Sequence, residues 1–147
     1  MDAIQQFVDE AGLKVYNKFK DVVDVVCRRD FISKFQKQVA LHSELKISIP
    51  KTVFLLKTEL ADSGFFASVS ARQRLSSLKF PVIVKPRISS ILSMSHNLLI
   101  VNSIEKLEEL IKHTEKYEYL TKDTIIVQEY IEAHYEQLIK LYAIGDR

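Results

Sequence analysis

Short apolar runs rich in β-branched residues follow Pro50, and they constrain the fold of this chain more than any other feature. Five such runs cover residues 52–56, 80–86, 98–101, 124–131 and 138–144. Runs of this length and composition predict strands. Stretches with helical spacing lie between them at residues 59–77 and 103–117. The sequence therefore predicts the order strand, helix, strand, strand, helix, strand, strand, which is an α/β (α+β) fold.

A serine-rich loop over residues 87–97 separates two of these predicted strands, which can pair as a hairpin. We therefore expect residues 50–131 to form a lobe with a mostly antiparallel sheet and helices on one face. Ser103 is a suitable N-terminal cap for the second helix of this lobe. Ile104, Leu107, Leu110 and Ile111 would form its buried stripe.

The residues before Pro50 read as helical. Helical spacing predicts helices that begin near Ile4, Lys20 and Asp30, with Gly12 as a helix stop and Asp30 as a cap. The apolar segment 13–16 could be a strand. The pattern ends at Pro50, because the residue before a proline is pushed out of the helical region.

We accordingly divide the chain into three parts. Residues 1–49 are a helical segment, which we interpret as the end of an N-terminal domain and its connection. Residues 50–131 are the lobe, and residues 132–147 are a hinge with the first strand of a further domain. Because the sequence stops directly after a predicted strand, we expect the chain to be a piece of a longer protein.

Composition excludes several classes of protein. Of 147 residues, 47% are hydrophobic and 27% charged, which supports a folded core, and a net charge of +2 argues against a bulk nucleic-acid binder. The single cysteine, Cys27, excludes a disulfide framework and a cysteine-rich zinc module. No apolar run approaches the roughly 18 residues of a membrane span. The acidic, amphipathic N-terminus does not read as a secretory signal, so we expect a cytoplasmic protein.

Lys85 is the most informative single position, because it ends the apolar run Val82–Val84 and precedes Pro86. Its stem would pack on the strand and its ammonium would point into the space above the sheet. That arrangement suits a nucleotide phosphate, since lysine acts as a compact point charge. The alternative is an edge lysine that protects the end of a sheet.

Four other places carry residues with two possible readings. His96 could bind a phosphate or an inositol hydroxyl, or be solvated. The strand end Gln128–Ile131 could be a hinge whose backbone pairs with an adenine edge, or a plain strand end. Lys140 could reach a phosphate or substrate, or face outward. The pair Arg28–Arg29 at a helix start suits an anion or a surface ion pair.

The sequence shows no cluster with metal-ligand spacing. The four histidines are scattered, and neither a phosphate-binding P-loop nor a nucleophile elbow occurs. We therefore predict no metal ligand and no catalytic residue within the chain.

Taken in order, several motifs resemble one kinase family. FPVIVKP, a loop ending in Ser–His, LLIV, a helix, IIVQEYI and LIKLYAIGD are similar to the central part of the inositol-tetrakisphosphate 1-kinases, also called inositol 1,3,4-trisphosphate 5/6-kinases. Upstream, VVDVVCRRDF resembles the helix that leads to an arginine in that family, and SIPKTVFL resembles its strand entry. The resemblance implies an ATP-grasp fold and transfer of the γ-phosphate of ATP to a hydroxyl of an inositol polyphosphate.

The resemblance also implies roles for individual residues. ATP would be bound by Arg29, Lys85, Gln128, Glu129, Tyr130 and Ile131. The inositol phosphate would be contacted by His96 and Lys140. Magnesium would accompany ATP, with its ligands beyond Arg147, so the resemblance implies that residues 1–147 alone lack kinase activity. The last predicted strand would then lack a neighbour and could mediate self-association.

Two other functions stay open from the sequence. A carboxylate–amine ligase of the glutathione synthetase type would share the fold and differ in its acceptor. A non-catalytic interaction module would retain the fold without the chemistry. The loop 87–95 lacks the glycine that the kinase family carries there, and together with the missing metal ligands this keeps such a module open.

Overall fold

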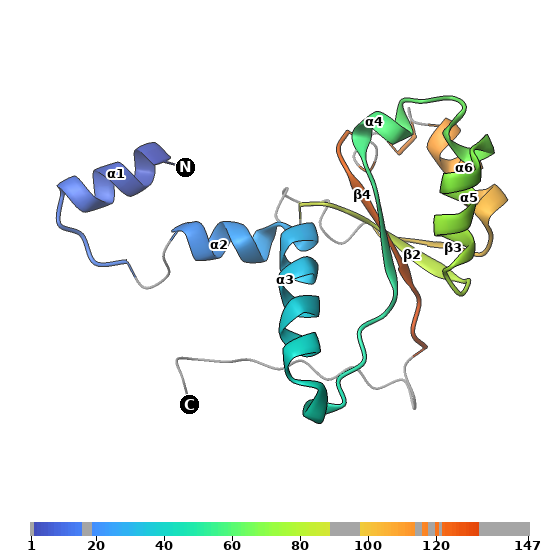
Figure 1. Cartoon of the computed structure of the whole chain (residues 1–147). Helices are drawn as coiled ribbons and strands as arrows, with labels where there is room; N and C mark the ends of the chain where they lie inside the picture. Colours follow the sequence, from blue (N-terminus) through green and yellow to red (C-terminus); the bar gives the residue numbers. More distant parts are fainter. Residues whose placement is uncertain are drawn as a thin grey trace.

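The structure is a computed structural model, and it describes residues 2–15, 19–88, 98–113, 116–117, 120 and 122–132. These residues form a mixed helix-and-sheet fold (Figure 1). The N-terminal elements are α1 (Asp2–Glu10), α2 (Phe19–Val26), α3 (Arg28–Leu41) and the short 3₁₀ helix η1 (Ser43–Leu45). The lobe comprises β1 (Thr52–Leu55), α4 (Lys57–Leu60), η2 (Phe65–Ala67), α5 (Val69–Ser76), β2 (Val82–Pro86), β3 (Leu99–Val101), α6 (Ile104–Lys112) and β4 (Ile125–Glu129).

The four strands form one sheet in the order β1-β4-β2-β3, and every neighbouring pair is antiparallel. β2 and β3 pair directly, with Val82 opposite Val101 and Val84 opposite Leu99. The predicted antiparallel lobe and its hairpin pairing are therefore confirmed. The predicted strand at 138–144 lies outside the described residues.

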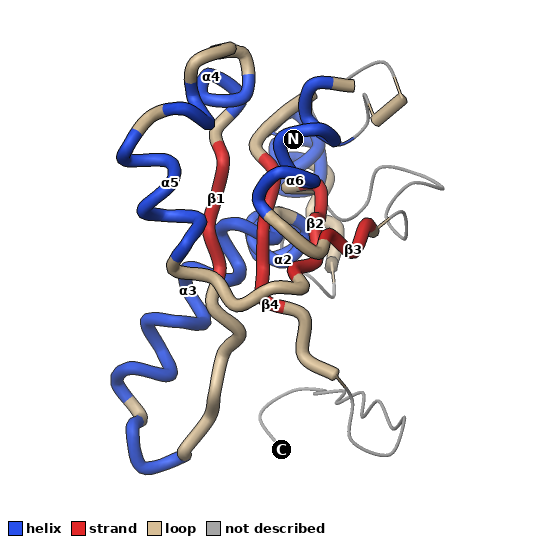
Figure 2. Tube along the Cα trace, turned by 90° about the vertical axis from the view of Figure 1, so that its right-hand side faces the viewer, coloured by secondary structure: helices blue, strands red, loops and turns tan. Residues whose placement is uncertain are grey.

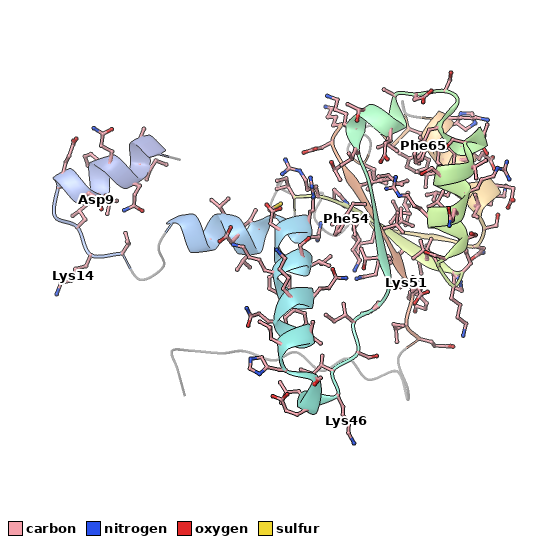
Figure 3. All side chains as sticks on the ribbon, in the orientation of Figure 1. Asp9, Lys14, Lys46, Lys51, Phe54 and Phe65 are labelled. Carbon is pink, nitrogen blue, oxygen red and sulfur yellow. The ribbon has the colours of Figure 1, made fainter. Side chains whose placement is uncertain are left out.

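Helices α5 and α6 cover one face of the sheet (Figure 2). Leu75 of α5 and Leu107 of α6 are fully buried and belong to one hydrophobic cluster with Val82, Val84 and Val127 of the central strands. Phe65 of η2 extends this cluster on the same side (Figure 3). β4 is buried along its first four residues, so its side chains are covered on both faces of the sheet.

Helix α6 follows its sequence pattern closely. The Ser103 side chain accepts a hydrogen bond from the Lys106 backbone N–H at 3.2 Å, which confirms the predicted cap. Leu107, Leu110 and Ile111 are its buried residues. The helix ends at Lys112, earlier than the predicted end near residue 117.

The predicted helix at 59–77 is three separate pieces, α4, η2 and α5. The Asp62 carboxylate accepts a hydrogen bond from the Gly64 N–H at 2.9 Å, which forms a tight turn after α4. Ser68 then begins a new helix, because its hydroxyl accepts from the Ala71 N–H. Local side-chain bonds to the backbone therefore interrupt the helical pattern twice.

Two expectations about the N-terminal segment are wrong. Residues 13–15 form no strand. The N-cap of α3 is Cys27 and not Asp30, which lies in the first turn. Cys27 adopts an extended conformation because it pairs with Ile88 in an isolated antiparallel bridge, and this bridge separates α2 from α3. α3 itself buries none of its residues.

Within the described part of the chain, every helix is too short or too polar to cross a membrane.

Candidate functional site

Lys85 projects from the sheet on the side opposite α5 and α6. Val82 and Val84 pack into the helix-covered core, and side chains alternate along a strand, so Lys85 belongs to the other face. The same alternation on β1 and β4 assigns their partners. We call this surface the Lys85 face; it carries Thr52, Ile83, Lys85, Ile126 and Gln128.

The half-buried Lys85 ammonium is bonded to an uncharged group. Its Nζ donates to Oε1 of Gln128 at 2.6 Å. No carboxylate in the described ranges forms an ion pair with Lys85. The positive charge of Lys85 is therefore held in place without being neutralised by this partner.

Arg28 is fixed at the end of the same strand. Its Nη1 donates to the carbonyl oxygens of Pro86 at 3.0 Å and Ile88 at 3.4 Å, and its backbone N–H donates to the Arg87 carbonyl at 2.8 Å. These bonds tie the first residue of α3 to the chain just after Lys85. Partial burial of the Arg28 guanidinium lowers its pKa.

The two cations influence each other. Burial lowers the pKa of Lys85, and the charge of Arg28 lowers it further. An anion bound near Lys85 would offset both the cost of burying its charge and the effect of Arg28 on it. A lysine whose pKa is lowered by burial and by a second cation is a candidate for a functional site. The arrangement therefore suits an anion with several oxygens, such as a phosphate.

A cavity of about 500 Å³ lies at the exit of β4, within the usual size range of ligand pockets. It is lined by Lys79, Phe80, Pro81, Glu129, Tyr130, Ile131 and Glu132. Three of the four predicted hinge residues thus line one cavity. Gln128 does not, because its side chain bonds Lys85 on the sheet.

Some of the backbone N–H groups at the end of β4 are already used in hydrogen bonds. The Glu129 N–H donates to the Lys51 carbonyl at 2.9 Å, and the Tyr130 N–H donates to the Pro81 carbonyl at 3.0 Å. For the Ile131 N–H, no hydrogen bond to the described chain is found. An adenine edge could therefore pair with the Ile131 N–H and with carbonyls of the hinge, but not with the other two N–H groups.

The two neighbouring arginines at the start of α3 differ in their surroundings. Arg29, predicted to bind ATP, is exposed, whereas Arg28 bonds the end of β2. The helix begins at residue 28, two residues before the predicted start, and this turns Arg28 toward the sheet. His96 and Lys140 lie outside the described residues. Sequence reasoning also missed Thr52, because nothing local signals its contact with Gln128.

Metal ligands are not gathered in this part of the molecule. Among residues the structure describes, no group of three or more histidine, cysteine, aspartate or glutamate side chains could hold an ion. Lys85 and Arg28 could hold phosphate oxygens, whereas the described residues show no such cluster for an accompanying magnesium ion.

The chain matches no protein-family model, and a search of curated proteins found no relative.

Proposed function

We propose that residues 50–131, together with Arg28, form the nucleotide-binding lobe of an ATP-dependent inositol polyphosphate kinase of the ATP-grasp type. The supporting observation is the pair of partly buried cations at the end of β2, where the partner of Lys85 found among the described residues is the neutral amide of Gln128. The antiparallel sheet with helices on one face agrees with such a lobe. The choice of acceptor rests on the resemblance of the ordered motifs.

In this proposal the phosphates of ATP lie at Lys85 and Arg28, and the base lies in the cavity at the β4 exit. Lys85 is opposite Ile126, and Tyr130, the cavity residue that shares this face of β4, follows four residues later. At a rise of about 3.4 Å per residue, the cavity is roughly 14 Å from Lys85 along the strand. This separation leaves room for the ribose between base and phosphates.

The chain's own contribution to catalysis would be positioning and positive charge. Phosphoryl transfer needs little covalent help from the protein, and depends on orientation and charge stabilisation. Lys85 would hold phosphate oxygens, and a bound phosphate would favour its charged form. Magnesium, which the resemblance implies, would neutralise charge on the phosphates from ligands outside the described residues.

The proposal is tested by ATP binding to residues 1–147, measured by calorimetry or by NMR titration. Lys85→Met should weaken binding by about 1.5–3 kcal/mol, the range for a hydrogen bond to a charged group, or about 10- to 150-fold. Lys37→Met is the matched control, because Lys37 is exposed on α3 and loses the same charge. Equal ATP affinity of Lys85→Met and the parent chain would refute the proposal.

Binding should also weaken as the pH rises. Because the pKa of Lys85 is lowered in the free protein and a phosphate raises it, binding above the free pKa requires uptake of a proton. The affinity should be constant at lower pH and fall up to tenfold per pH unit above that pKa. A pH-independent affinity would mean that Lys85 does not contact the phosphates.

The molecule that receives the phosphoryl group distinguishes an inositol polyphosphate kinase from a carboxylate–amine ligase. In a protein that contains this lobe, a kinase consumes ATP when an inositol polyphosphate is added. A carboxylate–amine ligase requires a carboxylic acid and an amine instead. For residues 1–147 alone we expect at most weak nucleotide binding and no turnover, and measurable phosphorylation of an inositol polyphosphate would contradict this.

A further inference from the structure

A single chain of hydrogen bonds crosses the sheet beneath Lys85. The Lys85 Nζ donates to Oε1 of Gln128 at 2.6 Å, and Nε2 of Gln128 donates to Oγ1 of Thr52 at 2.9 Å. The Thr52 hydroxyl in turn donates to the Pro50 carbonyl oxygen at 2.9 Å. The chain connects β2 through β4 to the start of β1, so all three strands contribute to holding one ammonium group.

Strand register explains why these side chains meet. Thr52 lies opposite Gln128 in the β1–β4 pair, and Ile83 lies opposite Gln128 in the β4–β2 pair. Lys85 is two residues beyond Ile83 and is therefore the diagonal neighbour of Gln128 on the same face. Long side chains at diagonal positions are within reach of each other.

The direction of every bond in this chain is fixed by its two ends. The ammonium of Lys85 can only donate, and the carbonyl oxygen of Pro50 can only accept. The Gln128 amide must therefore present its oxygen to Lys85 and its nitrogen to Thr52. Hydrogen bonds that run in one direction strengthen each other.

The hydrogen bonds of β4 argue against Gln128 as a contact for adenine. The Tyr130 N–H bonds the Pro81 carbonyl, and antiparallel pairs alternate between bonded and non-bonded. Two residues earlier, the pair of Gln128 with Ile83 is again a bonded one. The backbone of Gln128 is thus used by the sheet, and its side chain, only 9% exposed, is used by Lys85 and Thr52.

We propose that Gln128 is a positioning residue, which holds the Lys85 ammonium at a fixed point of the site and, being uncharged, leaves its charge to a bound phosphate. This inference rests on the proposed function, since it assigns a role within the same phosphate site. A glutamate in this position would keep the geometry but would form an ion pair with Lys85. A methionine would keep the volume, but its thioether is only a weak acceptor and would hold the ammonium poorly.

The test compares Gln128→Glu, Gln128→Met and Thr52→Val with the parent chain, using ATP and inorganic triphosphate as probes. Gln128→Glu should weaken the binding of both probes at least tenfold, because the carboxylate competes with phosphate for Lys85. Gln128→Met should weaken both severalfold. Thr52→Val should have a smaller effect in the same direction, because it acts through Gln128. Gln38→Glu, on the exposed surface of α3, is the control for the added charge.

The Lys85 side chain, followed by NMR in the absence of ligand, supplies a readout that a purely structural role would not change. Gln128→Glu should raise the pKa of Lys85, since a carboxylate stabilises the ammonium. Gln128→Met should reduce the order of the lysine side chain. An unchanged Lys85 pKa in folded Gln128→Glu would overturn the inference.

The outcomes distinguish this inference from the proposed function. Loss of ATP binding in Lys85→Met, with parent-like binding in folded Gln128→Glu, would refute the role of Gln128 alone. A parent chain that binds neither probe would refute the proposed function, while the ligand-free NMR measurement would still decide whether Gln128 holds Lys85. A loss confined to ATP, with triphosphate binding intact, would make Gln128 a base contact and overturn the inference.

Discussion

Leu75→Ala tests whether the helix-covered face holds the lobe together while the Lys85 face carries its binding function. Leu75 has no exposed surface and belongs to the core cluster between α5 and the sheet. Truncation removes its transfer free energy and leaves a cavity, and such changes cost about 2–5 kcal/mol. Since domains are stable by only about 5–15 kcal/mol, this is a large part of the total.

Urea unfolding followed by circular dichroism measures the effect, because the chain has no tryptophan to serve as a fluorescence probe. With a slope of about 2 kcal/mol per molar urea, the midpoint should fall by roughly 1–2.5 M at unchanged slope. Below the transition, the ATP affinity of the folded variant should equal that of the parent, because Leu75 lies on the face away from Lys85.

Val69→Ala is the control, since Val69 begins the same helix and is 82% exposed. Its midpoint should move by no more than a few tenths of a molar, as expected for surface substitutions within about 0.5 kcal/mol. Equal losses for the two variants would refute the placement of the core. A loss of ATP affinity in folded Leu75→Ala would refute the separation of the two faces.

Three further predictions concern caps and charges. Ser103→Ala should lower the free energy of unfolding by about 1 kcal/mol in the same assay, because the Lys106 N–H loses its cap. Burial alone would raise the pKa of Asp123, but the hydrogen bonds from Arg87 and from the Thr124 N–H, together with the nearby positive charges, outweigh it and hold that pKa below its usual value. The carboxylate therefore stabilises the fold above its unfolded pKa of about 3.8 and loses this contribution as the pH falls through the lowered value, so Asp123→Asn should flatten the acid limb of the stability curve. Arg28→Met should weaken ATP binding in the calorimetric titration, and parent-like affinity would exclude Arg28 from the site.

The elements of the lobe could be predicted because their signals are local. The stripe of α6 and its serine cap lie within ten residues, and the cap forms as expected. Each strand shows an apolar run bounded by turn residues. The strand can therefore be predicted even though its observed ends differ from the predicted ones by one or two residues. β2 and β3 could be predicted to pair because they follow each other in the sequence with one loop between them, which is also a local signal.

The contacts of the site could not be predicted, because they depend on strand register. Lys85 and Gln128 are 43 positions apart, and Thr52 and Gln128 are 76 apart. A shift of one residue in the pairing would turn Gln128 to the other face, and a single sequence does not state that pairing. The contact of Arg28 with the end of β2 could not be predicted either, because Arg28 and Pro86 are 58 positions apart in the sequence.

The attachment of α3 has a consequence for amide exchange with solvent. Because α3 buries no residue, its hydrogen bonds should open at a small cost in free energy. Its amides should therefore exchange rapidly and at similar rates. The Arg28 N–H differs from them, since it is bonded to the Arg87 carbonyl and beside it Cys27 pairs with Ile88. This amide belongs to α3 by its place in the sequence, but its exchange should follow the slower opening of the chain at the end of β2. The exchange rate of this one amide therefore reports how often the helix separates from the lobe.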